Sequence, residues 1–513
     1  MKLLGITTSP YCCLESAKFL TTRALMPVIT PHCANLFQEH KDFYQFLLTC
    51  QQTSIQKKCT QFVSLSLEIK AVDPLTVLHA IHQSGKRHFY FEKGSQDALF
   101  YPAFLRQGSI GNPTALAAWD TTAELQVEGP QRFSQAKAFI DSCLANTISS
   151  GSLHLPFAGP HFFCSFTFFD QSAKESPFPA ASIFLPRWQV ARQRNHGVAV
   201  TNLAISPTVN LEMLSQNVWH EFQIIQRLQN ASLTLAENRK VFEKCDVAPA
   251  NSFKNAVLSG LKSIQTNQFH KIVLAHAVDV TSAAPFDLFH SLNNLRKLHP
   301  DCYIFSTSNG QGKTFIGASP ERLLRIHNQE LATDALAGSA PRGRTALEDA
   351  YFANGLLSSE KERREHRVVI DFITHCLAKL EIMPQRSPLP YLLQLPNIQH
   401  LRTPIHAKVP MNLHLLEILA ALHPTPAVAG APTEVVVEQI RRYEAFERDL
   451  YAAPLGWVDY QGNGEFAVGI RSALIDGRHA RLYAGAGIVA GSDPDKELAE
   501  INLKLQALLA ALA

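Results

Sequence analysis

The sequence has no excess of either charge and no long apolar run. Its 513 residues contain 47 Lys and Arg against 44 Asp and Glu, which gives a formal net charge of +3 at pH 7. This balance excludes the clustered basic surface by which proteins bind nucleic acids. No apolar run approaches the roughly 18 residues that a membrane span requires. We therefore expect neither a nucleic-acid-binding protein nor an integral membrane protein.

Cysteine and histidine patterns that would indicate disulfides or a zinc site are also missing. The ten cysteines include no Cys-x-x-Cys pair, and the 21 histidines include no His-Glu-x-x-His motif. A reduced, cytoplasmic protein is the simplest interpretation. Apolar residues make up 46% of the chain and charged residues 18%, so the chain can bury a core and is not disordered.

The first 59 residues differ in composition from the rest of the chain. They hold half of the cysteines, and their only acids are Glu15, Glu39 and Asp42. A transit peptide would share this shortage of acids but would be rich in arginine and serine, and Arg23 is the only arginine in the segment. We interpret residues 1–59 as an N-terminal extension at the periphery of the fold. A flexible or cleaved organellar targeting segment is the alternative.

Residue patterns predict strands and helices that do not alternate. Runs of β-formers predict strands, among them 61–70, 88–92, 161–170, 197–206 and 271–280. Apolar residues at helical spacing predict helices at about 211–244, 253–267, 346–381 and 493–512. Because the elements do not alternate as βαβ units would, we expect an α+β fold. The helix predicted at 211–244 would link an N-terminal half to a C-terminal half.

A pair of glutamates lies on the apolar face of the helix predicted at 346–381. At 100° per residue, Glu362 and Glu365 share a face with Val369 and Ile373, so they would point toward the interior. Burying paired carboxylates is costly unless a cation or strong donors compensate them. The alternative is that both glutamates form salt bridges with neighbouring Lys and Arg on a solvated turn.

The last predicted helix carries a second pair of glutamates. Glu497, Glu500 and Lys504 form one stripe at the edge of its apolar face. Two helices that each offer Glu-x-x-Glu make an oxygen-rich site of the kind that suits Mg²⁺. We predict a Mg²⁺ site that bridges these acids to an anionic small molecule.

Basic residues and glycines would surround this metal site. Arg471 and Lys504 would suit a substrate that carries carboxylates, and Gly485 and Gly487 would let the backbone approach it closely.

Seven short motifs occur in order in the second half of the chain. They are Lys271-IVLA, Gly317-ASPERLL, Ala335-LAGSAPRG, Ser359-EKERREHRVVID, Leu422-HPTPAVAG, Ala467-VGIRSA and Ala484-GAGIVAGSDPDKELAE. With them the chain resembles the chorismate-utilising enzymes, which include isochorismate, salicylate, anthranilate and aminodeoxychorismate synthases. The resemblance implies two lobes with large, mainly antiparallel sheets packed together and helices on the outside. It implies an N-terminal lobe at 60–244 and a chorismate-binding catalytic region at 245–513.

The resemblance also implies the catalytic residues. Family members that add water at C2 of chorismate carry a lysine in the first motif, where ammonia-using members usually carry glutamine, and this chain has Lys271. Lys271 would act as a general base toward water, whereas the same lysine read in isolation would be a strand residue reaching solvent. Glu321 matches the family's general acid, which protonates the departing C4 hydroxyl. Ala337 stands where some aminodeoxychorismate synthases carry a covalent lysine, so an amine nucleophile is absent.

Binding roles follow from the same resemblance. Glu365 and Glu500 would ligate Mg²⁺ directly, and Glu362 and Glu497 would hold its waters. His400 and His423 are each either a pocket residue or a packed histidine. Ser339 keeps the hydroxyl of the threonine that the family commonly has at this position. The residues implied for chorismate are Ser339, His400, His423, Tyr451, Arg471, Gly485, Gly487 and Lys504.

We therefore predict a Mg²⁺-dependent isochorismate synthase, an isomerase that interconverts chorismate and isochorismate. The alternatives are a salicylate synthase, which continues by eliminating pyruvate, and a catalytically silent chorismate-binding protein. The segments Asp73-PLTVLHA and His88-FYFE are similar to the N-terminal region of the forms that serve menaquinone or phylloquinone synthesis, which favours that pathway. We expect a monomer whose partner is its small-molecule substrate.

Overall fold

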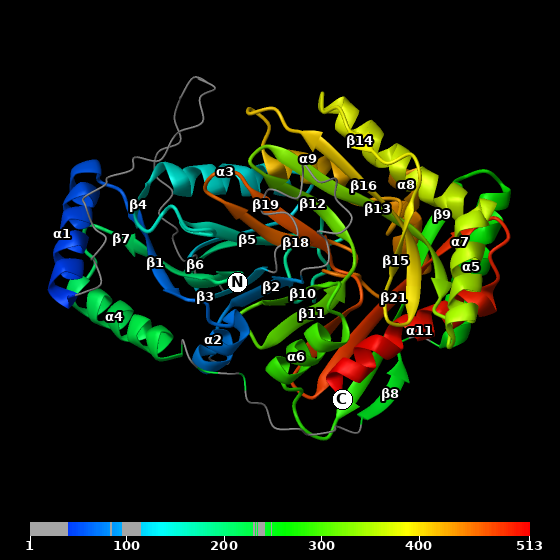
Figure 1. The fold of residues 1–513 in the computed structure, drawn as a ribbon, viewed down its shortest axis with the longest axis horizontal. Helices are drawn as coiled ribbons and strands as arrows, with labels where there is room; N and C mark the ends of the chain where they lie inside the picture. Colours follow the sequence, from blue (N-terminus) through cyan, green and yellow to red (C-terminus); the bar gives the residue numbers. More distant parts are fainter. Residues whose placement is uncertain are drawn as a thin grey trace, which may run out of the picture.

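Strands make up the centre of the molecule, and helices lie around them (Figure 1). The computed structural model describes residues 39–82, 85–94, 114–228, 231, 233, 242–247 and 249–513. The described strands are β1 Gln61–Lys70, β2 His88–Lys93, β3 Thr114–Val127, β4 Thr147–Gly151, β5 His161–Phe166, β6 Ala181–Gln193, β7 His196–Ile205, β8 Phe242–Asp246, β9 Lys271–Ser282, β10 Tyr303–Ser308, β11 Lys313–Ser319, β12 Arg322–His327, β13 Glu330–Pro341, β14 Gln385–Arg386, β15 Tyr391–Gln394, β16 Ile398–Lys408, β17 Gly430–Ala431, β18 Pro454–Asp459, β19 Gly464–Val468, β20 Ser472–Asp476 and β21 His479–Val489. The described helices are α1 His40–Lys57, α2 Pro74–Ile81, α3 Arg132–Ala145, α4 Leu211–Arg227, α5 Ala250–Gln265, α6 Leu288–Leu298, α7 Ala346–Ser358, α8 Glu360–Lys379, α9 Leu415–Leu422, α10 Thr433–Tyr443 and α11 Pro494–Leu512.

The strands form one hydrogen-bonded network that divides at β6. One edge of β6 pairs with β3, and its other edge pairs with β7 in one half and with β5 in the other. From β3 the sheet continues through β2, β10, β11, β20 and β21 to β9. From β5 it continues through β18, β19, β12 and β13 to β16. These pairs are all antiparallel, so the predicted α+β class with mainly antiparallel sheets is confirmed.

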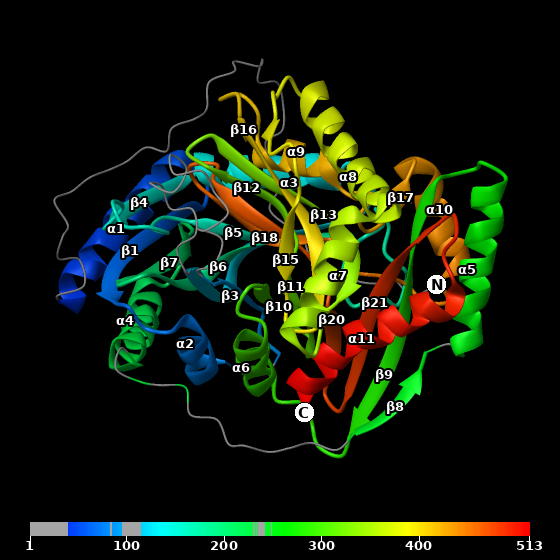
Figure 2. The ribbon, with the colours of Figure 1, turned by 45° about the vertical axis from the view of Figure 1, so that its right-hand side comes forward.

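Helices pack on the outside of both branches. Helix α1 contacts α4 beside β1 and β7, at the left of Figure 1. Helix α8 contacts β13, and α11 contacts β21 and α6; Figure 2 brings α7, α8 and α11 into view on the side of these strands. The contact faces are apolar, with Val369 and Ile373 of α8 and Ile501 and Leu505 of α11 buried. No helix among the described residues is both long and apolar enough to cross a membrane.

Several elements match their sequence predictions, and two helices differ in extent. The strand predicted at 61–70 coincides with β1, and the one at 271–280 lies within β9. The helix predicted at 346–381 is wrong as a single helix, because Ser359 has an extended backbone, ends α7 and caps α8 by accepting a hydrogen bond from the Glu362 N–H. The helix predicted at 211–244 is also too long. Helix α4 ends at Arg227, and residues 242–246 form β8 because they pair with β9.

The predicted boundaries at residues 59 and 244 fall within packed elements. Residues 40–57 of the predicted extension form α1, whose Phe43 and Leu47 are buried, while residues 1–38 lie outside the described residues. Strand β8 runs across residue 244. Strands β2 and β5 of the predicted N-terminal lobe pair with β10 and β18 of the catalytic region. The division into an extension and two lobes stays a prediction, and the sheet is continuous across it.

Candidate active site

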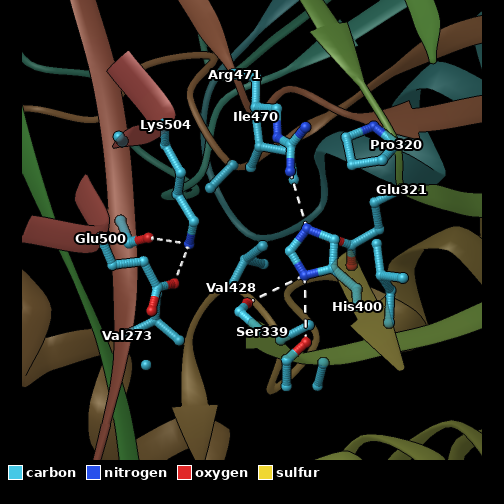
Figure 3. A pocket seen from close by; sticks show the side chains of 18 of the residues that line it. Val273, Pro320, Glu321, Ser339, His400, Val428, Ile470, Arg471, Glu500 and Lys504 are labelled. Carbon is cyan, nitrogen blue, oxygen red and sulfur yellow. Dashed lines mark hydrogen bonds and ion pairs between the residues drawn. The ribbon is translucent and has the colours of Figure 1, made fainter. Parts of the chain in front are cut away.

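A cavity of about 140 Å³ lies where the two branches of the sheet approach each other. Strands β13 and β16 come from one branch and β9 and β21 from the other, while α8 and α11 contribute charged side chains. The lining residues are Val273, Pro320, Glu321, Leu336, Ala337, Gly338, Ser339, Lys361, Glu362, Glu365, His400, Ala427, Val428, Tyr451, Ala452, Ile470, Arg471, Tyr483, Ala484, Gly485, Gly487, Glu497, Glu500 and Lys504. All predicted site residues except Lys271 and His423 are therefore brought together here (Figure 3).

Lys271 does not line the cavity itself but is bound to a residue that does. It is the first residue of β9 and is 2% exposed, and its Nζ lies 2.7 Å from Oε1 of Glu365. A Cβ atom at Gly487 would lie 2.9 Å from the same Oε1 and 3.2 Å from Cε of Lys271. The missing side chain at position 487 therefore leaves room for this ion pair. The alternative of a strand lysine that reaches solvent is excluded.

His423 lies apart from the cavity lining. Its Nε2 is 3.2 Å from the carbonyl oxygen of Phe168, and its ring lies edge-on against the Phe168 ring and near Phe133. Of the two alternatives for this residue, the structure favours the packed histidine. The position after Leu422 thus matches a family motif, but its tertiary contacts direct the ring toward Phe168 and toward Phe133 of α3 rather than toward the cavity.

Glu321 is buried next to the first residue of β12 and lines the cavity. Glu321 is 4% exposed. Burial raises the pKa of the Glu321 carboxyl to about 8, with a smaller rise from the charge of Asp334 and an opposing decrease from Lys271. The carboxyl is therefore mostly protonated at pH 7 and holds a proton that it can donate.

The four glutamates of α8 and α11 face the same cavity. Burial, and then the neighbouring charge of Glu365, raise the pKa of Glu362. Burial, and then the charge of Glu500, raise the pKa of Glu497 to about 7. Carboxylates that repel one another in this way are the donor set that a hard divalent cation stabilises. The interior placement predicted for Glu362 and Glu365 thus agrees with the structure better than a solvated turn.

Two of these carboxylates are held by lysines. Glu365 pairs with Lys271, and Oε1 of Glu500 lies 2.7 Å from Nζ of Lys504. Among the residues that the structure describes, no three His, Cys, Asp or Glu side chains are close enough to share one ion. The donor chemistry fits Mg²⁺, whereas these rotamers do not gather the donors around a single point.

Gly485 receives two functional side chains at close range. Nζ of Lys504 donates a hydrogen bond to the Gly485 carbonyl at 2.8 Å. A Cβ at residue 485 would lie 2.8 Å from the Tyr451 hydroxyl, so glycine is needed for the tyrosine to approach. The Tyr451 ring stacks on Tyr483 with centroids 5.2 Å apart, which fixes the direction of its hydroxyl.

Arg471, His400 and Ser339 form a hydrogen-bonded chain across the cavity wall (Figure 3). Nη2 of Arg471 lies 2.9 Å from Nε2 of His400, and Nδ1 of His400 lies 3.0 Å from Oγ of Ser339. The chain continues to the carboxylates, because the Ser339 N–H donates to Oε2 of Glu362 at 3.2 Å.

Arg448 is an important residue of this site that the sequence did not reveal. Its fully buried guanidinium pairs with Glu444 and donates to the carbonyls of Val428 at 2.9 Å and Val273 at 2.8 Å. Both of these residues line the cavity, and their segments are already neighbours, because the Val273 N–H donates to the Ala429 carbonyl at 2.8 Å. Arg448 therefore reinforces the contact between two adjoining segments of the cavity lining. Half of its hydrogen bonds go to these backbone carbonyls, which leave no signal in a sequence, and the other half go to Glu444. Lys361 was also missed, although its place beside Glu362 in a charged helical turn could have indicated it.

Comparison with known proteins agrees with this site. Residues 45–513 match the family model described as chorismate binding enzyme. The chain is 32% identical over 459 residues to the salicylate biosynthesis isochorismate synthase of Pseudomonas aeruginosa, covering 88% of this chain and 90% of that protein. It is 29% identical over 458 residues to isochorismate synthase MenF of Bacillus subtilis, covering 88% and 93%. The solved structure of MenF, the menaquinone-specific isochorismate synthase of Escherichia coli, superposes with a TM-score of 0.71 at 25% identity, covering 91% of this chain and 100% of that one.

These matches define the class of the protein. The chain belongs to the chorismate-binding enzyme family. Within that family it is an enzyme of the isochorismate synthase type, as its relatives over most of its length are.

Proposed function

We propose that this protein is an isochorismate synthase, an isomerase that converts chorismate reversibly into isochorismate. The observation that carries the proposal is that one site holds both a buried amine, Lys271, which contacts Glu365 of the cavity lining, and a buried carboxyl of the same lining, Glu321, whose pKa is raised to about 8. The reaction needs one group that takes a proton from water and one that gives a proton to a departing hydroxyl. Lys271 would be the proton acceptor, and Glu321 would be the proton donor.

The proposed reaction conserves the atoms of the substrate. The step requires Lys271 in its neutral form, with its proton released beforehand. Water then attacks C2 of chorismate and gives its proton to the Lys271 amine, the ring double bond shifts, and the C4 hydroxyl leaves as water with the proton of Glu321. One hydroxyl is gained and one is lost, so substrate and product are isomers. In the reverse direction the two residues exchange roles, which accounts for reversibility.

The carboxylates supply the metal part of the proposal. Glu365 and Glu500 would ligate Mg²⁺ directly, and Glu362 and Glu497 would hold its waters. The bound ion would neutralise the ring carboxylate of chorismate. Support comes from the four glutamates on one cavity and from the raised pKa values of Glu362 and Glu497.

The second carboxylate of chorismate would meet the basic side of the cavity. Arg471 and Lys504, with the Tyr451 hydroxyl and the Gly485 and Gly487 backbone, would hold the enolpyruvyl carboxylate. Hydrogen bonds between charged partners of this kind are about twice as strong as neutral ones. In support, Arg471 is 7% exposed and its Nη1 has no hydrogen-bond partner among the described residues.

Product analysis tests the proposal. Purified protein is incubated with chorismate and Mg²⁺, and products are separated by chromatography and identified by mass. Isochorismate as the main product is expected. Salicylate with pyruvate would instead indicate a salicylate synthase, and absence of turnover would indicate a silent chorismate-binding protein. Lys271→Ala is the matched variant, and unchanged turnover in it would contradict the assignment of the base.

The pathway, compartment and oligomeric state complete the proposal. We place the product in menaquinone or phylloquinone synthesis, in the cytoplasm, and expect a monomer. Support for the pathway is the resemblance of Asp73-PLTVLHA and His88-FYFE to the quinone-pathway forms. A deletion strain that loses quinone but keeps salicylate and catecholate siderophores is the expected result, and light scattering on the purified protein tests the monomer.

A further inference from the structure

His400 uses both of its ring nitrogens within the protein. It lies in β16 opposite Ser339 of β13 and is 7% exposed. Nδ1 is 3.0 Å from Oγ of Ser339 and 3.2 Å from the carbonyl oxygen of Gly338, and Nε2 is 2.9 Å from Nη2 of Arg471. Figure 3 shows these contacts on one wall of the cavity, with the pair of Lys504 and Glu500 on another.

The contact with Arg471 fixes the protonation state of the ring. A guanidinium has only N–H donors and no acceptor, so Nε2 of His400 must carry the lone pair that accepts. The ring proton is therefore on Nδ1, from which it is donated to the Gly338 carbonyl or the Ser339 hydroxyl. Burial, and then the charges of Arg471 and Lys504, lower the pKa of His400 well below its usual value, in agreement with a neutral ring.

A β-bulge produces the position of the Nδ1 partners. The register between β13 and β16 shifts between Ala337 and Ser339, and Gly338 at this shift has φ +78°, which a side chain rarely adopts. A Cβ there would also lie 3.2 Å from Oε2 of Glu362. The bulge thus brings the Gly338 carbonyl and the Ser339 hydroxyl to the ring, and it leaves no ring N–H for a substrate.

We propose that His400 is a positioning residue that orients the guanidinium of Arg471 toward the carboxylate of the substrate. Arg471 has a left-handed backbone, with φ +50°, and Nη1 of its guanidinium is buried without a hydrogen-bond partner in the described part of the chain. The acceptor on His400 engages Nη2 and leaves Nη1 for the ligand. The inference rests on the proposed function in one respect, that Arg471 binds a carboxylate of chorismate.

Two substitutions separate the functions of the two ring nitrogens. His400→Asn keeps a donor near the place of Nδ1 but removes the acceptor for Arg471, and His400→Gln can place an amide oxygen near the place of Nε2. Loss of one charge-assisted hydrogen bond predicts about a tenfold rise in KM for chorismate in His400→Asn, with kcat within about threefold. His400→Gln should recover most of that rise. Equal damage to kcat in both variants would overturn the proposal.

A double-mutant cycle tests whether His400 acts through Arg471. In an Arg471→Ala background, His400→Asn is expected to cause no further rise in KM, because the group that it orients is absent. A further rise of the same size would mean that His400 contacts the substrate by itself or serves only the fold, and the positioning role would be wrong.

The tautomer itself can be read without substrate. Nitrogen-15 NMR of the histidine-labelled protein, with the His400→Gln variant to assign the signal, should show a neutral ring protonated on Nδ1 across pH 6–8. A ring protonated on Nε2, or an imidazolium, would overturn the inference while leaving the proposed function intact. If the Nδ1–H ring is found but chorismate is not turned over, the proposed function fails and the tautomer stands.

Discussion

Nζ of Lys271 lies 2.7 Å from Oε1 of Glu365, and the two side chains are 2% and 13% exposed. The pair joins the residue proposed as the base to a residue proposed as a metal ligand, from two elements almost a hundred positions apart in the chain. Removing one partner of a buried pair leaves an uncompensated charge, which is strongly unfavourable. The geometry of this pair therefore affects both the proposed binding of Mg²⁺ by Glu365 and the proposed activation of water by Lys271.

Gly487→Ala should disturb this pair with little effect on the fold. The new Cβ would lie 2.9 Å from Oε1 of Glu365 and 3.2 Å from Cε of Lys271, so both side chains must move. A displacement of about 1 Å at reacting groups can reduce the rate by about a hundredfold. We expect kcat/KM for chorismate to fall by about tenfold to a hundredfold, measured by steady-state kinetics.

Gly355→Ala is the matched control for this substitution. Gly355 lies in α7, and a Cβ there would meet nothing within 4 Å. Its activity should be unchanged and its melting temperature equal or higher, because alanine favours helix over glycine. If Gly487→Ala kept full activity, the proposed dependence on the position of the ion pair would be wrong.

The pH dependence of the reaction should reveal Glu321. Its folded pKa is raised to about 8, so the carboxyl is protonated below that pH and loses its proton above it. A general acid acts only in its protonated form, and kcat/KM should therefore fall as the pH rises through about 8. Glu321→Gln should remove this limb along with most of the activity. A profile that stays flat to pH 9, or a limb that persists in the residual activity of Glu321→Gln, would exclude Glu321 as the acid.

Local patterns predicted the fold well where the chain alone determines the element. Alternation located β1 at its observed ends, and the apolar stripe located α11 with its two glutamates at the cavity. The break at Ser359 was missed because capping needs only one residue in a sequence that is otherwise helical on both sides. Strand β6, which joins the two branches, was also missed; most of its residues are buried, so it shows little alternation.

The candidate site was predicted mainly from motifs. Where the structure departs from that prediction, tertiary contacts that the sequence does not show are the reason. His400 and His423 looked equivalent in the sequence, yet β16 directs one ring into the cavity wall, while the other packs against Phe168. Arg448 could not be recognised, because the carbonyls of Val273 and Val428 that it binds come together only in the folded chain. Pairing of remote segments, rather than local preference, decides these contacts.

Removal of metal should abolish activity, and restored Mg²⁺ should recover it. Glu362 and Glu497 would hold waters of the ion, and changes to such outer groups typically cost about tenfold to a hundredfold in metal affinity or activity. We expect Glu362→Gln and Glu497→Gln to raise the Mg²⁺ concentration for half-maximal activity by that factor. Glu360→Gln, an exposed residue in the first turn of the same helix, is the control. Full activity in a chelator such as EDTA would contradict the metal site.

Arg448→Lys should destabilise the protein although it keeps the charge. Arg448 and Glu444 are 0% and 2% exposed, and the guanidinium also serves the carbonyls of Val428 and Val273. Lysine offers a single ammonium instead of a planar fork, so it cannot serve these acceptors together. Disrupting a buried pair costs about 3–5 kcal/mol, and because some of the contacts are kept, we expect a loss toward the lower end of this range. The measurement is the melting temperature by calorimetry.

Arg442→Lys is the control for the expected loss of stability in Arg448→Lys. Arg442 and Glu438 have the same i, i+4 spacing on α10 but are 67% and 75% exposed and 3.9 Å apart, and exposed pairs contribute little to stability. Its melting temperature should therefore stay close to that of the unchanged protein. If both variants had the same melting temperature, the contacts of the buried Arg448 guanidinium would not be a major source of stability. If Arg448→Lys melted lower but kept its KM for chorismate, the cavity lining would keep its shape without the contacts of Arg448.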